Sequence, residues 1–391
     1  MKKFAKMSLV AALAIAGTAA SAQPLAEAIK NVDVSGTVAY RYNDYEDQAQ
    51  GKKSENNAAL ASDRSDSATN NYKIAVNLKS KVNDDVTANT RFIIGSETDA
   101  AILGTSNDGD ANPSVNLTEV NFTYTGIANT AITLGKQGIA TPWTISRDAM
   151  GDEQTGTGIL AQYSAGPVTL VGAYFNQTNF DAAETSTTLA TDGSENIYVL
   201  GGVASFAGIT LDAFYADLQD TFDAYTIGLA ASYDVSSVKL SPFARYSSLD
   251  LDNSSNDNAL WQLGLGAKLG IFSAFVAYGE SDDEGGNVYI DSGAQTNMDY
   301  HWRVTADGSA DTEYLYVHAT ADVTDKVNVG LFYSEADYKN STTGDDTNEI
   351  YVQAKYQMSK NLATYVRLGE LDVDNSDEDG SMGRLHVQYS F

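Results

Sequence analysis

The chain alternates between apolar and polar residues over most of its length. At the C-terminus the apolar residues Leu385, Val387, Tyr389 and Phe391 alternate with the polar residues Arg384, His386, Gln388 and Ser390. Successive side chains of a β-strand point to opposite faces, so this pattern predicts a strand with one apolar and one polar face. The same pattern recurs at 32–42, 72–79, 225–233 and 350–357. A strand of this kind fits either a soluble sheet or a membrane barrel.

One apolar stretch, Ala259–Gly279, is long enough to suggest a membrane-spanning helix. It contains Gln262, Lys268 and several glycines, and its apolar residues fall on alternate positions. Two strands joined at about Gly270 therefore explain the stretch better than a helix does.

The connections between the predicted strands alternate in length, which separates the two kinds of sheet. Short turns fall near 83–85, 127–129, 166, 207–208, 235–236, 270, 323–325 and 359–361. Longer, mostly acidic loops fall at about 46–68, 97–112, 137–156, 179–194, 219–222, 251–257, 281–311, 339–346 and 374–380. Short turns on one rim and long loops on the other are typical of outer-membrane barrels.

The sequence therefore predicts an all-β fold, a transmembrane antiparallel β-barrel of about 18 strands within a range of 16 to 20. Its turns would be periplasmic and its loops extracellular, and an extra hairpin in 281–311 would give 20 strands. Strands of about 10–14 residues suit a tilted bilayer crossing. A closed barrel leaves no unpaired backbone edge toward lipid, so we expect the last strand to pair with the first.

The N-terminus predicts export. Three lysines precede a short apolar segment, and Ala20-Ser21-Ala22 has the form of a cleavage site. We therefore interpret residues 1–22 as a signal peptide and 23–391 as the barrel. Together with the barrel pattern, this predicts the bacterial outer membrane as the location and its lipid as a partner.

The chain is strongly acidic, with 24 Lys and Arg against 52 Asp and Glu, a formal charge of −28. Removing 1–22, which holds three lysines and no acid, brings it to about −31. This charge argues against nucleic acid as a partner and suits an acidic surface or a path for cations. The absence of Cys and the presence of only three His leave little for thiol, zinc or His-based chemistry.

Two segments resemble a known family. The segment Pro24–Tyr42, "PLAEAIKNVDVSGTVAYRY", and the C-terminal "HVQYSF" resemble the Campylobacter-type major outer-membrane porin family. This resemblance implies a homotrimer of 18-stranded general porins, a loop that narrows each pore, and a divalent cation such as Ca²⁺ nearby, with no cofactor required. The final aromatic residue, Phe391, resembles the insertion signal that the outer-membrane assembly machinery reads.

In the porins that the chain resembles, the third long loop folds into the barrel. The corresponding segment here is 137–156, with the charged residues Arg147, Asp148, Asp152 and Glu153. Inward-facing positions of neighbouring strands carry Arg41, Lys73, Arg91, Glu119 and Arg384. The basic wall and the acidic loop would together create a transverse electric field across a constriction of the pore. The alternative is an exposed loop, with lumen charges at unrelated heights.

Glu119, Asp148 and Asp152 are the candidate ligands for the cation that the resemblance implies, because hard cations prefer several oxygen ligands. The acidic segment 374–380 does not fit the EF-hand spacing and is interpreted as a solvated outer loop.

The sequence thus predicts a general diffusion porin that passes small hydrophilic solutes and ions, with moderate cation selectivity, and that is not an enzyme. Two alternatives share the fold: a barrel that acts mainly as a surface adhesin, and a barrel hydrolase that uses the few histidines.

Overall fold

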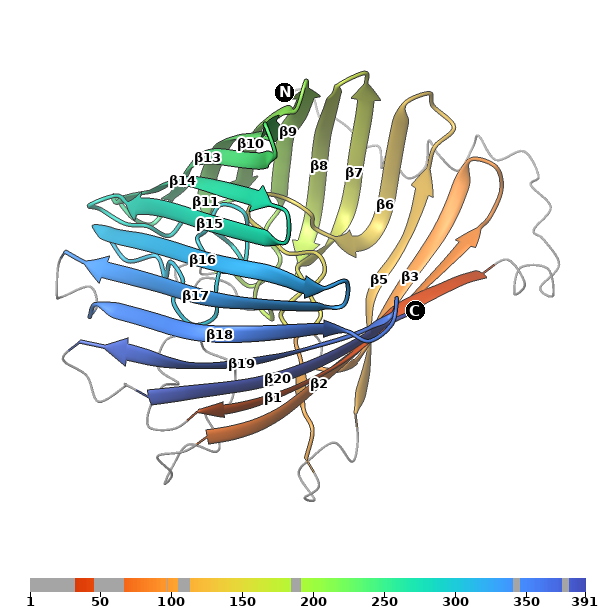
Figure 1. Cartoon of the computed structure of the whole chain (residues 1–391). Helices are drawn as coiled ribbons and strands as arrows, with labels where there is room; N and C mark the ends of the chain where they lie inside the picture. The colour runs from red at the N-terminus through yellow and green to blue at the C-terminus, as the bar shows by residue number, and fades with distance from the viewer. Residues whose placement is uncertain are drawn as a thin grey trace.

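Antiparallel strands make up most of the structure (Figure 1). The computed structural model describes residues 32–45, 67–96, 98–104, 113–183, 191–339, 345–374 and 380–391. The predicted signal peptide, 1–22, lies outside the described residues. No helix in the described ranges is both long and apolar enough to cross a membrane.

The strands follow one another along the chain in the order in which they pair. They are β1 (Val32–Tyr45), β2 (Ser67–Lys81), β3 (Val86–Gly95), β4 (Ala101–Ile102), β5 (Ser114–Tyr124), β6 (Thr130–Gly138), β7 (Thr155–Ala165), β8 (Val168–Thr178), β9 (Ile197–Phe206), β10 (Ile209–Leu218), β11 (Phe222–Ala231), β12 (Tyr233–Val235), β13 (Val238–Leu251), β14 (Asp257–Leu269), β15 (Phe272–Ser281), β16 (Thr312–Thr324), β17 (Val327–Tyr338), β18 (Thr347–Gln357), β19 (Leu362–Val373) and β20 (Gly380–Ser390).

The sheet closes on itself into a barrel of 18 long strands, which confirms the predicted fold class. Strands β4 and β12 are short pieces, since β3 pairs directly with β5 and β11 with β13. Strand β1 pairs with β2 on one side and with β20 on the other. The closure extends to the last residue, where the Phe391 amide donates to the Gly36 carbonyl at 3.0 Å. The extra hairpin considered for 281–311 is not formed, because all residues from 282 to 311 are described and none lies in a strand.

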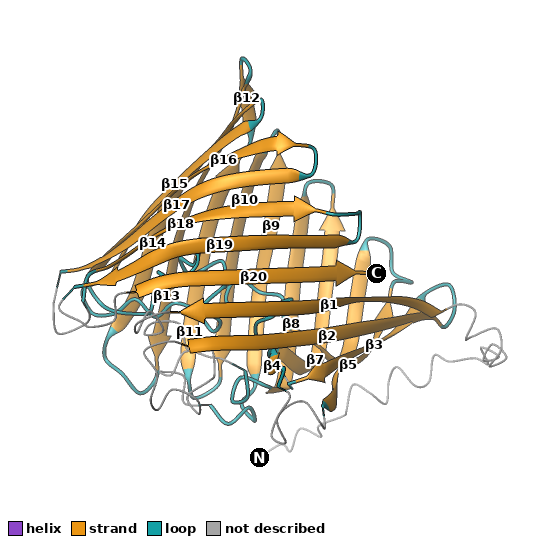
Figure 2. Cartoon of the chain, turned by 60° about the horizontal axis from the view of Figure 1, so that its bottom comes forward, coloured by secondary structure: helices purple, strands orange, loops and turns teal. Residues whose placement is uncertain are grey.

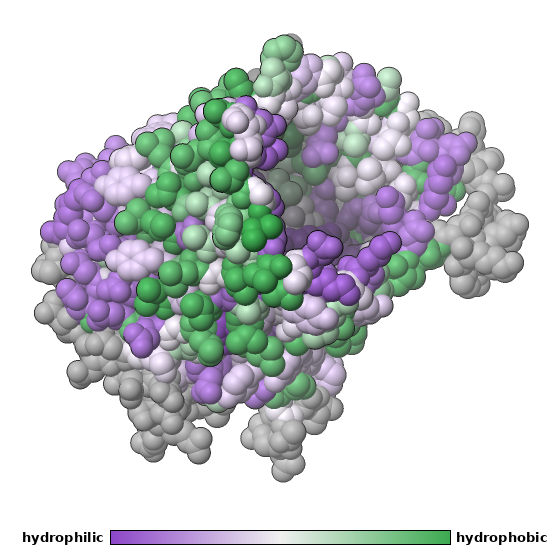
Figure 3. Space-filling model, in the orientation of Figure 1, coloured by the Kyte–Doolittle hydropathy of each residue, from purple (hydrophilic) through white to green (hydrophobic). Residues whose placement is uncertain are grey.

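The predicted alternation separates the two faces of the wall. On β9 and β18 the outward positions hold Leu200, 68% exposed, and Val352, 52% exposed. The inward neighbours Val199 and Tyr351 are buried. Figure 3 shows apolar side chains over much of the outer face and a hollow with many hydrophilic side chains at its rim and interior. An apolar band on the outside suits lipid, so the chain is an outer-membrane barrel.

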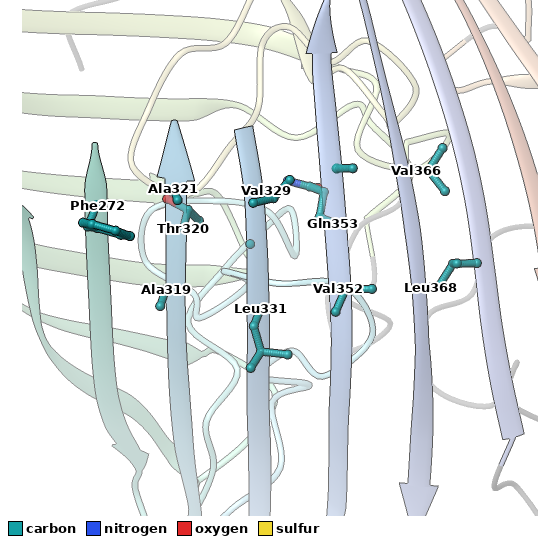
Figure 4. A pocket seen from close by; sticks show the side chains of 12 residues that line it. Phe272, Ala319, Thr320, Ala321, Val329, Leu331, Val352, Gln353, Val366 and Leu368 are labelled. Carbon is teal, nitrogen blue, oxygen red and sulfur yellow. The ribbon is translucent and has the colours of Figure 1, made fainter. Parts of the chain in front are cut away.

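One shallow groove interrupts the outer face between β15 and β19. Figure 4 shows its lining, which includes Phe272, Ala319, Leu331, Val352 and Leu368. The groove has a volume of about 550 Å³. These side chains lie on the apolar face, so the groove belongs to the lipid-facing surface and not to the lumen.

Turns and loops occupy opposite rims, as the spacing predicts (Figure 2). The tight turns depend on residues that tolerate positive φ, such as Asn129 (φ 62°) and Gly270 (φ 58°). The hairpin of β12 and β13 extends the short-turn rim (Figure 2).

Near the long-loop rim, the inner wall of the barrel carries buried apolar residues. A lumen filled only with water would favour polar residues at these positions. One buried cluster joins β8–β11 and β13 to Ile139, Trp143 and Ile290. A second joins β14–β20 and β1 to residues between Val288 and Ala306. Apart from Phe180, the residues from outside the strands come from two loops, which therefore pack inside the barrel.

Candidate functional site: two loops inside the barrel and the charged lumen wall

The loop between β6 and β7, residues 139–154, is held to the wall by a buried ion cluster. Glu153 receives two hydrogen bonds from Arg91, at 2.6 and 2.9 Å, and lies 3.2 Å from the Lys73 ammonium. Lys73 also donates to the Gly151 carbonyl at 2.6 Å. None of the three charged side chains is more than 5% exposed. Burying two cations and one anion is tolerated only because each charged group contacts a group of opposite charge. The cluster therefore fixes the loop against β2 and β3.

A second ion pair lies beside the first, nearer to the open lumen. The Arg147 guanidinium contacts the Glu119 carboxylate of β5 at 2.5 Å, and Glu119 also accepts from the Gly138 amide. The Arg147 side chain is 46% exposed, while that of Glu119 is 7% exposed. The Arg147 guanidinium therefore faces water and shields the Glu119 carboxylate from it.

Asp148 reaches lumen water from the same loop. Burial by the surrounding barrel favours its neutral form, but hydrogen bonds from the amides of Met150 and Gly151 and the charges of Lys73 and Arg41 lower the pKa of Asp148 below its ordinary value. Asp148 therefore remains ionised at neutral pH and supplies a fixed negative charge inside the barrel.

The loop between β15 and β16, residues 282–311, is a second inward loop, anchored by a carboxylate of the wall. Glu349 on β18 accepts hydrogen bonds from the amides of Trp302, at 2.9 Å, and Arg303, at 2.7 Å. Tyr316 on β16 donates to the Met298 carbonyl at 2.7 Å. Buried backbone groups of a loop need partners, and the wall provides them here.

The two loops meet inside the barrel. The Trp143 carbonyl accepts hydrogen bonds from the amides of Ile290 and Asp291, both at 3.0 Å. The Gln154 side chain donates to Asp291 at 2.6 Å. Burial raises the pKa of Asp291 to about 6, and the nearby acids Asp152 and Asp148 add to this effect. Because the loops leave different parts of the wall and bond to each other, they cross the lumen together.

Arginine is concentrated on the lumen side of the described structure. Inward strand positions and the two loops hold Arg41, Arg91, Arg147, Arg245, Arg303, Arg367 and Arg384. Arg384 donates to Asn43 at 2.6 Å and lies over the Trp302 ring, 5.2 Å from its centre. Arg367 on β19 also faces Trp302, at 5.6 Å. On the opposite part of the wall, Arg245 forms two hydrogen bonds with Asp212.

The predicted site residues fall into two groups. The structure brings Lys73, Arg91, Glu119, Arg147, Asp148, Asp152 and Glu153 together around loop 139–154. Arg41 and Arg384 lie on the adjoining strands β1 and β20, where Arg41 is paired in register with His386. Lys73, Arg91 and Glu153 contact one another and are closed off from water. The charge presented to the lumen therefore comes from Arg147 and Asp148 in this group.

The candidate metal ligands do not form a ligand set. Glu119 is engaged by Arg147, and Asp148 accepts backbone hydrogen bonds from its own loop. In the described part of the chain, no three His, Asp or Glu side chains are arranged to hold a metal ion. The residues therefore do not fit the divalent cation that the resemblance implies.

Among the described residues, the contacts of His301 do not match a serine hydrolase site. His301 contacts Ser334 at 3.0 Å, and Ser334 donates to Glu349 at 2.8 Å. A nucleophilic serine needs to give its proton to histidine, whereas this hydroxyl gives it to the carboxylate. Ser334 is also fully buried. The group serves to hold loop 282–311 in place.

The comparisons with known proteins agree with this geometry. A family model of the Campylobacter major outer membrane protein matches residues 1–391, the whole chain. The chain belongs to this family. A search of the curated proteins finds no match. The resemblance found in the first strand and the C-terminus is thus confirmed over the whole chain.

Several solved structures are similar to this chain over most of its length. OccK9 (OpdG) of Pseudomonas aeruginosa has 15% identity and a TM-score of 0.73, with 93% of this chain and 99% of that chain covered. OccK2 (OpdF) of the same organism, solved with glucuronate, has 14% identity and a TM-score of 0.73, with 93% and 98% covered. A BenF-like porin from Pseudomonas fluorescens Pf-5 has 16% identity and a TM-score of 0.73, with 93% and 99% covered. At these identities the likeness shows the fold alone.

Sequence reasoning missed the lumen residues of loop 282–311 and of β19. The run Tyr300–Arg303, "YHWR", is aromatic and basic within an otherwise acidic loop, and this contrast could have indicated an inward position. Arg367 occupies an inward phase on its strand and could have been found by the same alternation that indicated Arg384.

Proposed function

We propose that this chain is a passive diffusion porin for small hydrophilic solutes and ions, with moderate cation selectivity. Membership of an outer-membrane porin family and the closed barrel support a channel. The single observation that carries the proposal is the pair of loops anchored inside the barrel. A pore that selects solutes needs a fixed narrow zone; a buried ion cluster holds the first loop, and hydrogen bonds to Glu349 hold the second.

The acidic mouth and Asp148 of loop 139–154 support a preference for cations, although Arg41 and Arg384 add positive charge to the adjoining wall. Of the predicted eyelet charges, the buried cluster around Glu153 carries a net single positive charge away from water, and Arg147 is neutralised by Glu119. Asp148 remains ionised on the open side of the loop. Acidic residues also dominate the long loops at the mouth of the pore. These loops and Asp148 of loop 139–154 therefore both attract cations.

Related channels indicate the size of solute to test. OccK2 was solved with glucuronate and OpdK with vanillate, both small organic acids. We include solutes of this size in the proposal. Assembly as a homotrimer, and recognition of Phe391 by the assembly machinery, also remain part of it. A surface adhesin would not require two loops fixed inside the barrel, which makes this alternative weaker.

Single-channel recording of the purified, folded protein in a planar bilayer tests the proposal. We expect long-lived open levels in steps of three and a reversal potential on the cation side in a KCl gradient. Correctly folded protein that passes no current would overturn the porin assignment. Current levels that open one at a time, with unchanged cation selectivity, would overturn only the proposed homotrimer.

A further inference from the structure

A polar cavity of about 300 Å³ lies in the lumen wall at the short-turn rim. It is lined by β18, β19, β20 and the turn between the first two, with Lys355, Gln357, Lys360, Asn361, Thr364, Tyr365, His386, Gln388 and Ser390 among its residues. Alternation places Lys355 on the same inward face as the buried Tyr351. The cavity is therefore at the periplasmic exit of the proposed pore.

The cavity has a fixed frame. The Asn361 side chain donates to the Ser390 carbonyl at 2.6 Å, and the Ser390 amide donates back to the Asn361 carbonyl at 2.8 Å. Gln357 donates to the Ser359 carbonyl at 2.7 Å. These bonds hold the turn against the terminal strand, so the position of Lys360 is set by the closure of the barrel.

The lining of the cavity holds two lysines and no acid. Several lysines elsewhere in the described structure contact acids, for example Lys73, Lys268 and Lys339. Within the same described residues, Lys355 and Lys360 have no acid within ion-pair distance, although acids outnumber basic residues by 52 to 24. Two ammonium groups therefore face one cavity with amide and hydroxyl groups between them.

A stacked pair of rings bounds one side of the cavity. The rings of Tyr365 and His386 stack with centres 4.9 Å apart and an angle of 20° between their planes. One step further up the same strand, Arg367 lies 5.0 Å from the centre of the Tyr365 ring. A carbon chain can contact the edges of these rings while its polar groups reach the side chains around them.

We propose that this cavity is an exit site for small organic anions that carry one carboxylate and several hydroxyl groups. Lys355 and Lys360 bind the carboxylate, while Gln357 and Gln388 bind hydroxyls. The site rests on the proposed porin function, since its ligand reaches it by way of the pore. Its affinity is low because both lysines are solvated, which suits a site from which solute must leave.

Single-channel recording with potassium gluconate and sorbitol as probes tests the site. The two molecules have the same six-carbon chain and differ in one carboxylate. We expect gluconate to produce brief current interruptions whose frequency rises with concentration, and sorbitol at equal concentration to produce far fewer. K355Q and K360Q are expected to weaken the gluconate effect by up to about fivefold each.

Lys79 provides the matched control, because it faces the lumen on β2 but does not line the cavity. K79Q removes an equal charge and should leave the interruptions unchanged, and K355R with K360R should preserve them. Equal effects of gluconate and sorbitol, or an equal loss in K79Q, would overturn the site while the channel still conducts. A protein that does not conduct would instead overturn the porin assignment.

Discussion

The ion cluster of Glu153, Lys73 and Arg91 should decide whether loop 139–154 stays inside the barrel. The substitution Glu153→Gln keeps the size of the side chain and removes its charge, so packing around Trp143 is preserved. Lys73 and Arg91 would then be left as two buried cations without their anion. Removing one partner of a buried pair costs about 3–5 kcal/mol. Here this cost weakens the docking of loop 139–154 and leaves the stability of the barrel unchanged.

A shift of this size changes the docking equilibrium by a factor of roughly 100 to 5000, since each 1.4 kcal/mol is tenfold. We expect E153Q to show larger and noisier single-channel currents than the parent protein. Arg147 lies in this loop, so trypsin provides a second readout: cleavage after Arg147 should accelerate in E153Q. Heat-modified migration on a gel should still show a folded barrel.

Two further variants separate charge from packing. The triple change K73M, R91M and E153Q removes all three charges and should return the current noise toward that of the parent protein, because no uncompensated charge is left. The exposed pair of Lys268 and Asp322 supplies the control, since D322N should cost no more than about 1 kcal/mol and leave the pore unchanged. If E153Q conducts quietly and resists trypsin as the parent protein does, the cluster does not hold the loop.

Three other outcomes follow from the lumen and the terminal strand. The double change D148N and D152N should move the reversal potential toward anions, and the shift should persist at high salt because the charges lie inside the barrel; unchanged selectivity would exclude loop 139–154 as the selective zone. Burial raises the pKa of Asp291 to about 6, above its unfolded value, so its stabilising contribution is complete at low pH and lost as pH rises through 6. Current noise should therefore increase between pH 5 and 7, and D291N should remove this dependence; a flat profile in the parent protein would contradict it. Changing Phe391 to Ser removes an apolar side chain at the seam between β1 and β20. This change should lower the amount of heat-modifiable barrel in outer-membrane fractions, and equal amounts in the two proteins would refute the role of this residue.

The strands and their connections could be predicted because their signal is local. A period of two decides which side chains face lipid, and it placed Leu385 outward and Arg384 inward without any knowledge of the neighbouring strands. The alternation of short turns and long loops then determined the number of crossings. Closure by β1 and β20 followed from the requirement that lipid meets no unpaired edge.

The site could be predicted only in part because the height and path of a loop are not local properties. Alternation shows that Lys73 and Arg91 point inward, but it does not show that Glu153 covers both. The inward path of 282–311 depends on Glu349, which is about 46 residues away from the amides that it binds. Neither partner carries a pattern that identifies the other, so this second loop was not recognised from the sequence.

The seam between the first and last strands sets an order of events in the life of the protein. Gly36 and Phe391 exchange two hydrogen bonds across it, although the chain between them includes all the other strands. The free edge of β1 cannot be satisfied until the final residues have been synthesised and exported, and contacts of such long range form slowly. Throughout that interval the chain carries an exposed edge and many apolar faces, both of which favour aggregation. The closed ring therefore leaves the chain with an unpaired edge until its final strand is available.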